Sequence, residues 1–355
     1  MKIAIIGLGA ATKNIHVPAL KKLINIEVVG GYDANKNISS FSFPIFSSAE
    51  ELLNKTNPDL VIIATPTFTH FELTCLALSH NCHVLVEKPF MESLEQADHI
   101  IALSNKVQRW VIVNNQYRFM NIHQVAKKQI NTDKFGDLLF ICASQTFFVS
   151  DETETGWRGQ DKQRTCKEFG IHVLDLCRFF FDEDPVAIYA RMPKGSNPDG
   201  PDLLNLIQLE FSGDRVAQII LDRLSKGTHR YLELRLDGSK GVVETSIGGK
   251  LGLNAGINAR NKRPYLNLNL AMGGSAVLHQ GERSKQLATD PLDLFVNATY
   301  KLLLAFISAL KNGETPPCNA IDNRNTLALM FAAYESSEKG SVIDMSQYYE
   351  VNLTL

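Results

Sequence analysis

Two glycines near the start of the chain have the spacing of a loop that holds the phosphates of a dinucleotide. Gly7 and Gly9 follow a short apolar run and precede a segment of helical periodicity. In such a loop the first glycine permits a tight turn, the second lets pyrophosphate approach the backbone, and the helix N-terminus offers its amides. The pattern alone is equally typical of an ordinary turn. The predicted phosphate-binding residues are Gly7, Gly9, Ala10, Ala11 and Thr12, the last in the third glycine position.

An acidic residue, Asp33, follows the next predicted strand. Its separation from the glycine loop is close to the ~20 residues expected for the acid that binds a ribose 2′-hydroxyl. No arginine adjoins Asp33 to receive a 2′-phosphate, and the nearest cation is Lys36. The sequence therefore favours NAD over NADP. The alternative is that Asp33 only forms the turn before Asn35.

Two side chains that can carry a proton stand at the ends of predicted elements. Lys88 follows the apolar run His83–Glu87, and open parallel sheets bind ligands at the carboxyl ends of their strands. A partly desolvated ammonium there could hold or shuttle a proton. His172 opens a predicted helix, and imidazole titrates close to neutral pH. The plain alternatives are a surface lysine and a structural histidine.

The elements that must position these residues change character near residue 119. Before it, short apolar strands alternate with helical segments, which predicts a parallel sheet covered on both faces and doubly wound. The predicted strands are Lys2–Ile6, Glu27–Gly31, Leu60–Ala64, His83–Glu87 and Trp110–Val113, and the predicted helices are Asn14–Ile24, Ala49–Leu53, His70–His80 and a segment around Leu94–Ser104.

From residue 120 onward, closely spaced strands and Gly-containing turns predict an antiparallel sheet. The segment Asn254–Asp290, rich in Gly and Asn, is expected to form long loops or an extended arm. The fold class is thus α/β plus α+β, with domains at 1–119 and 120–355. The predicted strands are Leu138–Phe148, Pro185–Met192, Leu203–Phe211, Arg215–Leu224, Tyr231–Leu236 and Val342–Met345, and the predicted helices are Ile122–Ile130, Ile171–Phe181, Pro291–Leu310 and Arg324–Ser336.

An ordered series of motifs resembles the glucose–fructose oxidoreductase / inositol dehydrogenase (Gfo/Idh/MocA) family. The match spans nearly the whole chain, and the ordered set is specific although no single member is. The motifs are Gly7-x-Gly9, His16 with Pro18-Ala19-Leu20, Ala64-Thr65-Pro66 with His70, Val84-Leu85-Val86-Glu87-Lys88-Pro89, Gln116-Tyr117-Arg118-Phe119, Gly170-Ile171-His172 with Asp175, Asp322 before a helix, and Ser341-Val342 after Gly340.

The resemblance implies a Rossmann domain followed by an α+β domain with a large open, mostly antiparallel sheet. It also implies an NAD(P)-dependent oxidoreductase that transfers a hydride between nicotinamide and a hydroxyl-bearing carbon of a sugar, cyclitol or related polyol. Two alternatives stay open. One is a dinucleotide-binding sensor or interaction protein with little catalysis, and the other is a reductase of an imine or another unsaturated compound.

The same resemblance implies roles for individual residues. Lys88 matches the catalytic lysine and His172 the main acid/base, while Glu168 occupies the place of the acid four residues before that histidine. The i, i+4 spacing puts Glu168 and His172 on one helix face if the helix reaches back that far. The Lys88–Pro89 bond is a candidate for the cis form.

Further residues are expected around the nicotinamide and the substrate. His70 is alternatively a packing residue or helix cap, Arg118 a partner of a structural carboxylate, and Trp157-Arg158 part of a plain surface loop. The candidate cofactor contacts are Thr65, Pro66, His70, Glu87 and Asn115, and the candidate substrate contacts are Tyr117, Arg118, Trp157, Arg158 and Asp175.

Two departures from the family pattern lie just before His172. Glu168 stands where the family usually has Asp, and Arg164-Thr165-Cys166-Lys167 stands where it usually has a glycine-rich run. A longer acid and a bulkier, cationic approach would reshape the pocket. Either the substrate carries an anionic group met by Arg164 or Lys167, or the carboxylate role is lost.

Composition limits the partners. A formal net charge of -2 provides no field that attracts nucleic acid or an anionic membrane. The longest apolar runs, such as Leu60–Ala64, are too short to span a bilayer. The 6 cysteines are scattered without zinc-ligand spacing, which predicts reduced thiols in a cytoplasmic protein and no metal site.

Oligomerisation is predicted from one strand. Its apolar residues Leu204, Leu206, Leu209 and Phe211 spread over both faces, and a sheet that is apolar on both sides needs a covered outer face. Family members commonly pair through this sheet, so the resemblance implies a homodimer or homotetramer.

Overall fold

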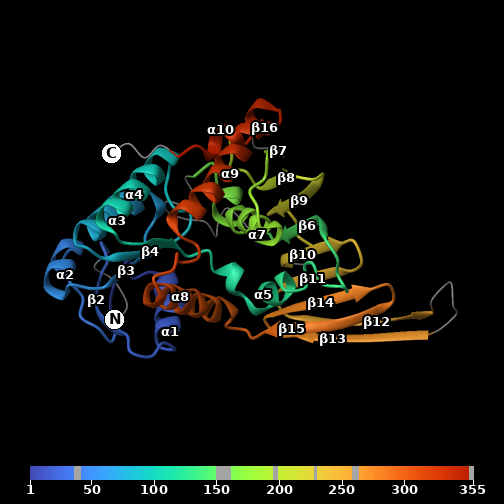
Figure 1. Ribbon diagram of the computed structural model, residues 1–355, viewed down its shortest axis with the longest axis horizontal. Helices are drawn as coiled ribbons and strands as arrows, with labels where there is room; N and C mark the ends of the chain where they lie inside the picture. The colour runs from blue at the N-terminus through green and yellow to red at the C-terminus, as the bar shows by residue number, and fades with distance from the viewer. Residues whose placement is uncertain (36–40, 149–160, 195–198, 228–229, 258–263, 352–355) are drawn as a thin grey trace. The chain divides into compact units, whose positions relative to one another are not determined.

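The computed structural model describes residues 1–35, 41–148, 161–194, 199–227, 230–257 and 264–351 (Figure 1). The chain forms two compact units. Unit 1 comprises Met1–Gln116, Phe295–Ala328 and Tyr348–Leu355, and unit 2 comprises Tyr117–Leu294 and Leu329–Gln347. The division near residue 116 lies close to the expected one at 119, but two C-terminal segments join unit 1.

Unit 1 is built on a five-stranded sheet in the order β2-β1-β3-β4-β5. All neighbouring strands run parallel, which confirms the predicted sheet. The order reverses at β1, so the crevice beside its carboxyl end is where such a sheet binds ligands. The strands are β1 (Lys2–Ile6), β2 (Glu27–Tyr32), β3 (Leu60–Ile63), β4 (His83–Val86) and β5 (Val111–Val113).

Four strands of this sheet, β1, β3, β4 and β5, are mostly buried, as a parallel sheet covered on both faces requires, whereas the edge strand β2 is partly exposed. Every residue of β3 is buried, as are the last three of β4. Two helices begin at serine N-caps: Ser48 accepts the amide of Glu51, and Ser93 accepts that of Gln96. The helical segments are α2 (Ala49–Thr56), η2 (Thr67–Thr69), α3 (His70–Ser79), α4 (Leu94–Val107) and η3 (Gln116–Phe119).

The first helix differs from the expected Asn14–Ile24 at both ends. Helical structure begins at residue 10, directly after Gly9, and includes a π-helical segment, η1 (Thr12–His16), before α1 (Val17–Leu20). Pro18 lacks the amide for an ordinary helical hydrogen bond, which explains a local change of helix type. The early start brings the helix N-terminus to the glycine loop.

Unit 2 is built on a nine-stranded sheet, β15-β14-β11-β10-β6-β9-β8-β7-β16. β6 and β9 pair in parallel and the other pairs are antiparallel, which confirms a mostly antiparallel sheet. The strands are β6 (Leu138–Thr146), β7 (Ala187–Arg191), β8 (Leu204–Phe211), β9 (Arg215–Asp222), β10 (Arg230–Gly238), β11 (Val242–Ile247), β14 (Gly274–Gln280), β15 (Arg283–Asp290) and β16 (Ile343–Asp344).

Of the two alternatives expected between residues 254 and 290, the long loops are wrong and an extended arm is closer to the structure. This segment forms most of a hairpin, β12 (Lys250–Ile257) with β13 (Pro264–Ala271), followed by β14 and β15. Figure 1 shows the hairpin extending beyond the large sheet. Asn and Gly have low strand propensity and hid a period-2 pattern of leucines. β11 was also missed.

Two helices pack against different strands of the large sheet. α5 (Asn121–Lys127) packs against β11, β14 and β15, while α7 (Ile171–Phe181) packs against β6. β8 alternates more regularly than expected, because Ile207, Leu209 and Phe211 are buried and Leu206 is 38% exposed on the opposite face. Apolar side chains therefore occur on both faces of β8, but most of them point into the core.

Two long helices and a short one close the chain: α8 (Leu294–Asn312), α9 (Ala320–Lys339) and α10 (Ser346–Tyr349). Among the described residues, α8 is the one helix long and apolar enough to span a membrane. Its Thr299, Leu302 and Phe306 are completely buried inside the protein. Leu304 on the same helix is 41% exposed, and 44% of the apolar stretch is buried. Length and composition alone are weak evidence for a membrane span.

Candidate functional site

The glycine loop of unit 1 has the geometry of a phosphate-binding turn. Gly7 has φ +93°, and a Cβ there would lie 2.4 Å from the carbonyl oxygen of Ala64. A Cβ at Gly9 would meet no described atom within 4 Å. The first turn of the helix starting at residue 10 includes Ala10 and Ala11, and first-turn amides lack intrahelical acceptors. The loop is therefore open to an anion at the positive end of a helix.

Thr12 is compatible with this turn although a glycine was expected. Its side chain is fully buried, and its hydroxyl donates to the carbonyl oxygen of Gly7 at 2.6 Å. The hydroxyl thus closes the loop internally and leaves the outer side of Gly9 clear.

Asp33 lies beside the glycine loop and is half-exposed. One carboxylate oxygen accepts the amide of Leu8 at 2.6 Å, and the other accepts that of Asn35 at 2.7 Å. The second contact is the turn-forming role considered from the sequence, and the first ties the acid to the loop. Since each carboxylate oxygen can accept more than one hydrogen bond, both roles leave capacity for ribose hydroxyls.

Lys88 follows β4 at the carboxyl edge of the sheet, and the Lys88–Pro89 bond is cis. Beside it, the Glu87 carboxylate contacts His16 Nε2 at 2.7 Å and accepts the Asn114 side-chain amide at 2.7 Å. Burial raises the pKa of Glu87, but the hydrogen bond and charge of His16, the charge of Lys88 and the Asn114 amide outweigh it and lower that pKa to about 2. An ionised carboxylate therefore adjoins the lysine at neutral pH.

Thr65 and Pro66 follow β3, and His70 joins them to the lysine segment. The imidazole lies 3.0 Å from the carbonyl oxygen of Pro89 through Nδ1 and 3.0 Å from that of Thr65 through Nε2. Burial lowers the pKa of His70, although these carbonyls oppose the effect. The geometry is that of a ring packed between two backbone segments, which was the alternative considered for His70.

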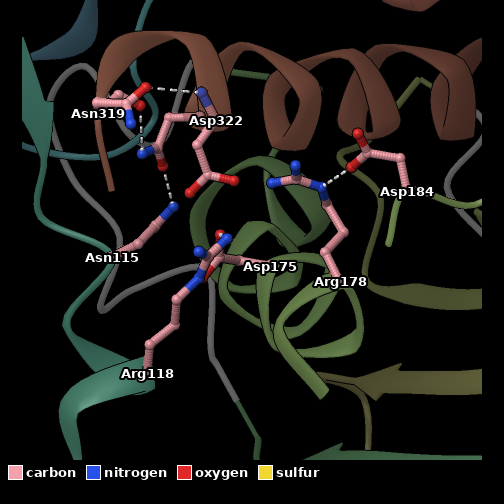
Figure 2. A network of polar contacts seen from close by, with 8 residues as sticks. Asn115, Arg118, Asp175, Arg178, Asp184, Asn319 and Asp322 are labelled. Atoms are coloured by element: carbon pink, nitrogen blue, oxygen red, sulfur yellow. Dashed lines mark hydrogen bonds and ion pairs between the residues drawn. The ribbon is translucent and has the colours of Figure 1, made fainter. Parts of the chain in front are cut away.

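Asn114 and Asn115 diverge at the end of β5. Asn114 contacts Glu87, whereas the side-chain amide of Asn115 donates to Asn323. The side-chain amide of Asn323 donates in turn to the backbone carbonyl of Asn319 at 3.0 Å. The side-chain oxygen of Asn319 accepts the amide of Asp322 at 3.1 Å (Figure 2). In unit 1 Asn115 therefore anchors the start of α9, and Asn114 belongs to the Glu87 network.

In unit 2, His172 lies in the first turn of α7 and is 4% exposed. Its ring stacks on Tyr117 with centroids 4.0 Å apart and planes inclined by 3°. The Tyr117 hydroxyl lies 2.8 Å from that of Tyr231. Burial raises the pKa of Tyr117 well above its ordinary value, so this phenol stays neutral. The pair fixes the plane of the imidazole.

Tyr231 was not predicted as a site residue. It belongs to β10, and its ring faces Phe147 with centroids 6.3 Å apart. Tyrosine is common in strands, so its residue type carried no signal of a role. Only the pairing of β10 with β6 brings it to the Tyr117–His172 stack.

Glu168 lies on η5 (Cys166–Gly170), a π-helical turn that continues directly into α7. Its amide donates to the carbonyl of Arg164 at 2.8 Å, and the residue is half-buried. The helix therefore reaches back far enough to include both Glu168 and His172, the condition set for placing them on one face.

Arg118 and Asp175 form a buried ion pair with two hydrogen bonds, of 2.7 and 2.6 Å (Figure 2). Their side chains are 13% and 1% exposed. A bidentate pair of this kind matches the structural alternative considered for Arg118, and it engages Asp175 as well. Trp157 and Arg158 lie outside the described residues.

The cationic approach to His172 also has partners. Lys167 pairs with Asp161 at 2.8 Å, and Arg164 is 4% exposed. Among the described residues no cluster of His, Cys, Asp or Glu is arranged to hold a metal ion. A cavity of about 540 Å³ opens in unit 2 around Lys127, Phe180 and Arg215. It adjoins the C-terminal end of α7 and contains none of the predicted site residues.

Comparison with known proteins matches both parts of the chain. Residues 1–115 match a family model described as an oxidoreductase family with an NAD-binding Rossmann fold. Residues 127–345 match the C-terminal alpha/beta domain of the same oxidoreductase family.

Individual relatives are distant. D-apiose dehydrogenase of Paraburkholderia graminis is 22% identical over 359 residues, covering 97% of this chain and 89% of that protein. Glucose-6-phosphate 3-dehydrogenase of Bacillus subtilis is 27% identical over 209 residues, which are 55% of this chain and 58% of that protein.

A solved structure shows the same fold. It is an oxidoreductase from Agrobacterium radiobacter in complex with NAD+, L-tartaric acid and magnesium, with a TM-score of 0.78 and 19% identity over 98% of this chain and 99% of that one. The open glycine loop with Asp33, the parallel and antiparallel sheets and both family matches agree with the motif series. The chain thus belongs to the Gfo/Idh/MocA family of oxidoreductases, with an NAD-binding Rossmann domain at its N-terminus.

Proposed function

We propose that this protein transfers a hydride between NAD(H) and a hydroxyl-bearing carbon of a sugar, cyclitol or related polyol. The observation that carries the proposal is a proton-carrying side chain in a defined environment in each unit. Lys88 adjoins the ionised Glu87, and His172 stacks on Tyr117. The relatives named for glucose 6-phosphate and apiose support a sugar-like substrate.

The residues of unit 1 fit the dinucleotide. Gly9 leaves the loop open, the helix N-terminus can receive the pyrophosphate, and Asp33 retains capacity for ribose hydroxyls. The bound nicotinamide supplies the hydride acceptor or donor.

The chain's own side chains would move the proton. In the oxidation direction His172 takes the proton of the reacting hydroxyl, held in plane by Tyr117 and its hydrogen-bonded partner Tyr231. Lys88, at the carboxyl edge of the sheet in unit 1, is the second group that can hold or relay a proton. Glu168, one turn before His172, supplies a polar contact to the substrate.

The test combines cofactor binding with turnover. Thermal-shift titrations with NAD+, NADH, NADP+ and NADPH would be followed by absorbance at the nicotinamide band with D-apiose, D-glucose 6-phosphate, myo-inositol and sugar acids. We expect stabilisation by NAD(H) and turnover of one compound class, lost in Lys88→Met and His172→Ala. Lys55→Met, at a lysine 65% exposed and paired on α2, is the matched control.

Each negative result is informative. Binding of NAD(H) without turnover across the panel would favour a sensor or another acceptor bond, and imines would be assayed next. Absence of dinucleotide binding would contradict the cofactor assignment for this chain. Turnover of the phosphate or acid members alone would identify an anionic substrate group.

We also propose a cytoplasmic homodimer or homotetramer. All six cysteines are free thiols, which suits a reducing compartment. Leu206 on the outer face of β8 is an exposed apolar residue that a second copy would cover. Light scattering at several concentrations tests the assembly, and a monomer at all of them would contradict it.

A further inference from the structure

The helix that carries Glu168 and His172 has no N-cap of its own. Its first turn is the π-helical η5, and the preceding Thr165 makes no side-chain capping hydrogen bond. A helix start leaves several backbone amides without partners inside the helix, and burying them unsatisfied is costly. Another part of the chain must therefore supply the acceptors.

Asp202, in the loop before β8, supplies most of them. It is 2% exposed, and one of its oxygens accepts the amides of Arg164 and, at 3.1 Å, Thr165. The other oxygen accepts the amide of Cys166 at 3.1 Å and the side-chain amide of Asn205 at 2.9 Å. A carboxylate with this set of donors is an N-cap contributed from a distant part of the sequence.

Tyr334 of α9 completes the cap. Its hydroxyl donates to Asp202 at 3.1 Å and accepts the amide of Lys167 at 3.3 Å. Burial raises the pKa of Tyr334 well above its ordinary value, so the phenol remains a donor. Four consecutive amides, from residue 164 to 167, thus find acceptors on two side chains.

Close packing against the sheet also restrains the position of this helix. A Cβ at Gly170 would lie 2.7 Å from Leu221 of β9, so the helix approaches the sheet closely there. Packing at Gly170 sets the distance of the helix from the sheet, whereas the Asp202–Tyr334 cap restrains its first turn. Together they determine where Glu168 and His172 lie within unit 2.

We propose that Asp202 is the positioning residue for Glu168 and His172, with Tyr334 as its partner. The cap acts on Arg164-Thr165-Cys166-Lys167, the run that replaces the glycine-rich segment implied by the family resemblance. Arg164, Thr165 and Cys166 are buried, so their backbone amides need acceptors within the protein. This inference rests on the proposed function, because it assigns Asp202 to the same reaction.

The test compares two buried carboxylates that cap helices in unit 2. Asp202→Asn replaces one accepting oxygen by a donating NH2 group. With the NH2 in place of Oδ2, Cys166, Asn205 and Tyr334 lose their acceptor. Asp290→Asn weakens the cap on Asn121 and Ile122 of α5. We expect Asp202→Asn to lower kcat about 10- to 100-fold for the panel substrate, as small displacements of catalytic groups do. The substrate KM and the NADH affinity should change less than about threefold. Asp290→Asn should lose thermal stability but keep kcat.

Hydrogen exchange of the full-length chain gives a readout without turnover. Exchange of the 164–172 amides should rise in Asp202→Asn and to a smaller extent in Tyr334→Phe, which also serves if the first variant fails to fold. Wild-type kcat in both Asp202→Asn and Tyr334→Phe, or equal loss of kcat in Asp290→Asn, would overturn the proposal. Absence of wild-type turnover would remove the proposed function and this inference together, whereas retained turnover in the variants removes only the inference.

Discussion

The two units hold their proton-carrying residues in different ways. Around Lys88 the supporting residues come from the strand ends of the parallel sheet and from the first helix of unit 1. Glu87 is the residue directly before the lysine. Around His172 the supports are Tyr117, Tyr231, Asp202 and Tyr334, which lie far apart in the sequence. The cofactor side is thus built from the strand ends and first helix of one regular α/β sheet. The substrate side depends on which strands and helices of unit 2 pack together. A change of substrate could follow from substitutions in unit 2 that leave the nucleotide fold intact.

The strongest test of this comparison replaces the proton-carrying side chain of each unit. Lys88→Met and His172→Ala should each lower kcat about 10²- to 10⁴-fold, because general acid–base groups contribute on that scale. If both act on one substrate, the double variant should be little worse than either single one. Steady-state kinetics of all three measures this, and additive losses would mean that the units act in separate steps.

Substitution of Arg118 tests whether the Arg118–Asp175 pair of unit 2 stabilises the fold or binds substrate. Arg118→Met leaves the Asp175 carboxylate, 1% exposed, without its guanidinium, which should cost about 3–5 kcal/mol in the free energy of unfolding. Urea denaturation measures the loss. A double variant, Arg118→Met with Asp175→Leu, should recover part of it. A rise in KM at unchanged stability would instead show that Arg118 binds substrate.

Glu87 should make the stability of unit 1 depend on pH. Its pKa is about 2 in the folded chain against 4.5 ordinarily, so its ionised form stabilises the fold above pH 4.5. That contribution, about 3 kcal/mol, declines as the pH falls from 4.5 toward 2. The difference in unfolding free energy between wild type and Glu87→Gln should shrink over this range, and a constant difference would contradict the assignment.

Substitution of Asp33 tests whether this residue makes unit 1 prefer NAD(H) to NADP(H). Asp33→Ser removes a charged acceptor for ribose hydroxyls and should weaken NADH about tenfold, since hydrogen bonds to charged groups are worth about 1.5–3 kcal/mol. Binding of NADPH should fall less or improve, because a negative charge near its 2′-phosphate is removed. Fluorescence titration with both nucleotides measures the ratio, and equal losses would indicate a purely structural Asp33.

The smallest effect is expected at Tyr231. Tyr231→Phe removes one hydroxyl contact with Tyr117 and should cost about 1 kcal/mol of stability. A few-fold lower kcat with unchanged NADH affinity would agree with a role in holding the His172 ring. Tyr189→Phe on β7, which β6, β9 and β8 separate from β10 in the same sheet, is the control, and the same kinetic change there would argue against a specific role.

The difference between the units also explains what the sequence could predict. Local patterns predicted the Gly7 turn, Asp33 and Lys88. Each of them follows a strand of the same parallel sheet, so all three lie at its carboxyl edge. Asp202 and Tyr231 could not be found in this way, because their contacts depend on which strands pair. The hairpin in place of predicted loops shows the same limit, since Asn and Gly obscured its alternating leucines. The early start of the first helix follows from its junction with Gly9 and from Pro18, features that an averaged helical periodicity does not detect.

The chain returns to its first unit at residue 295, before the second is complete, and this has a consequence for how the protein can be divided. A fragment ending at residue 119 would lack α8, whose Leu302, Leu303 and Phe306 are completely buried, and the early part of α9 that Asn115 anchors. The nucleotide unit is therefore discontinuous in the gene. Exchange of the substrate unit alone between relatives by recombination needs four crossover points, near residues 116, 294, 328 and 347.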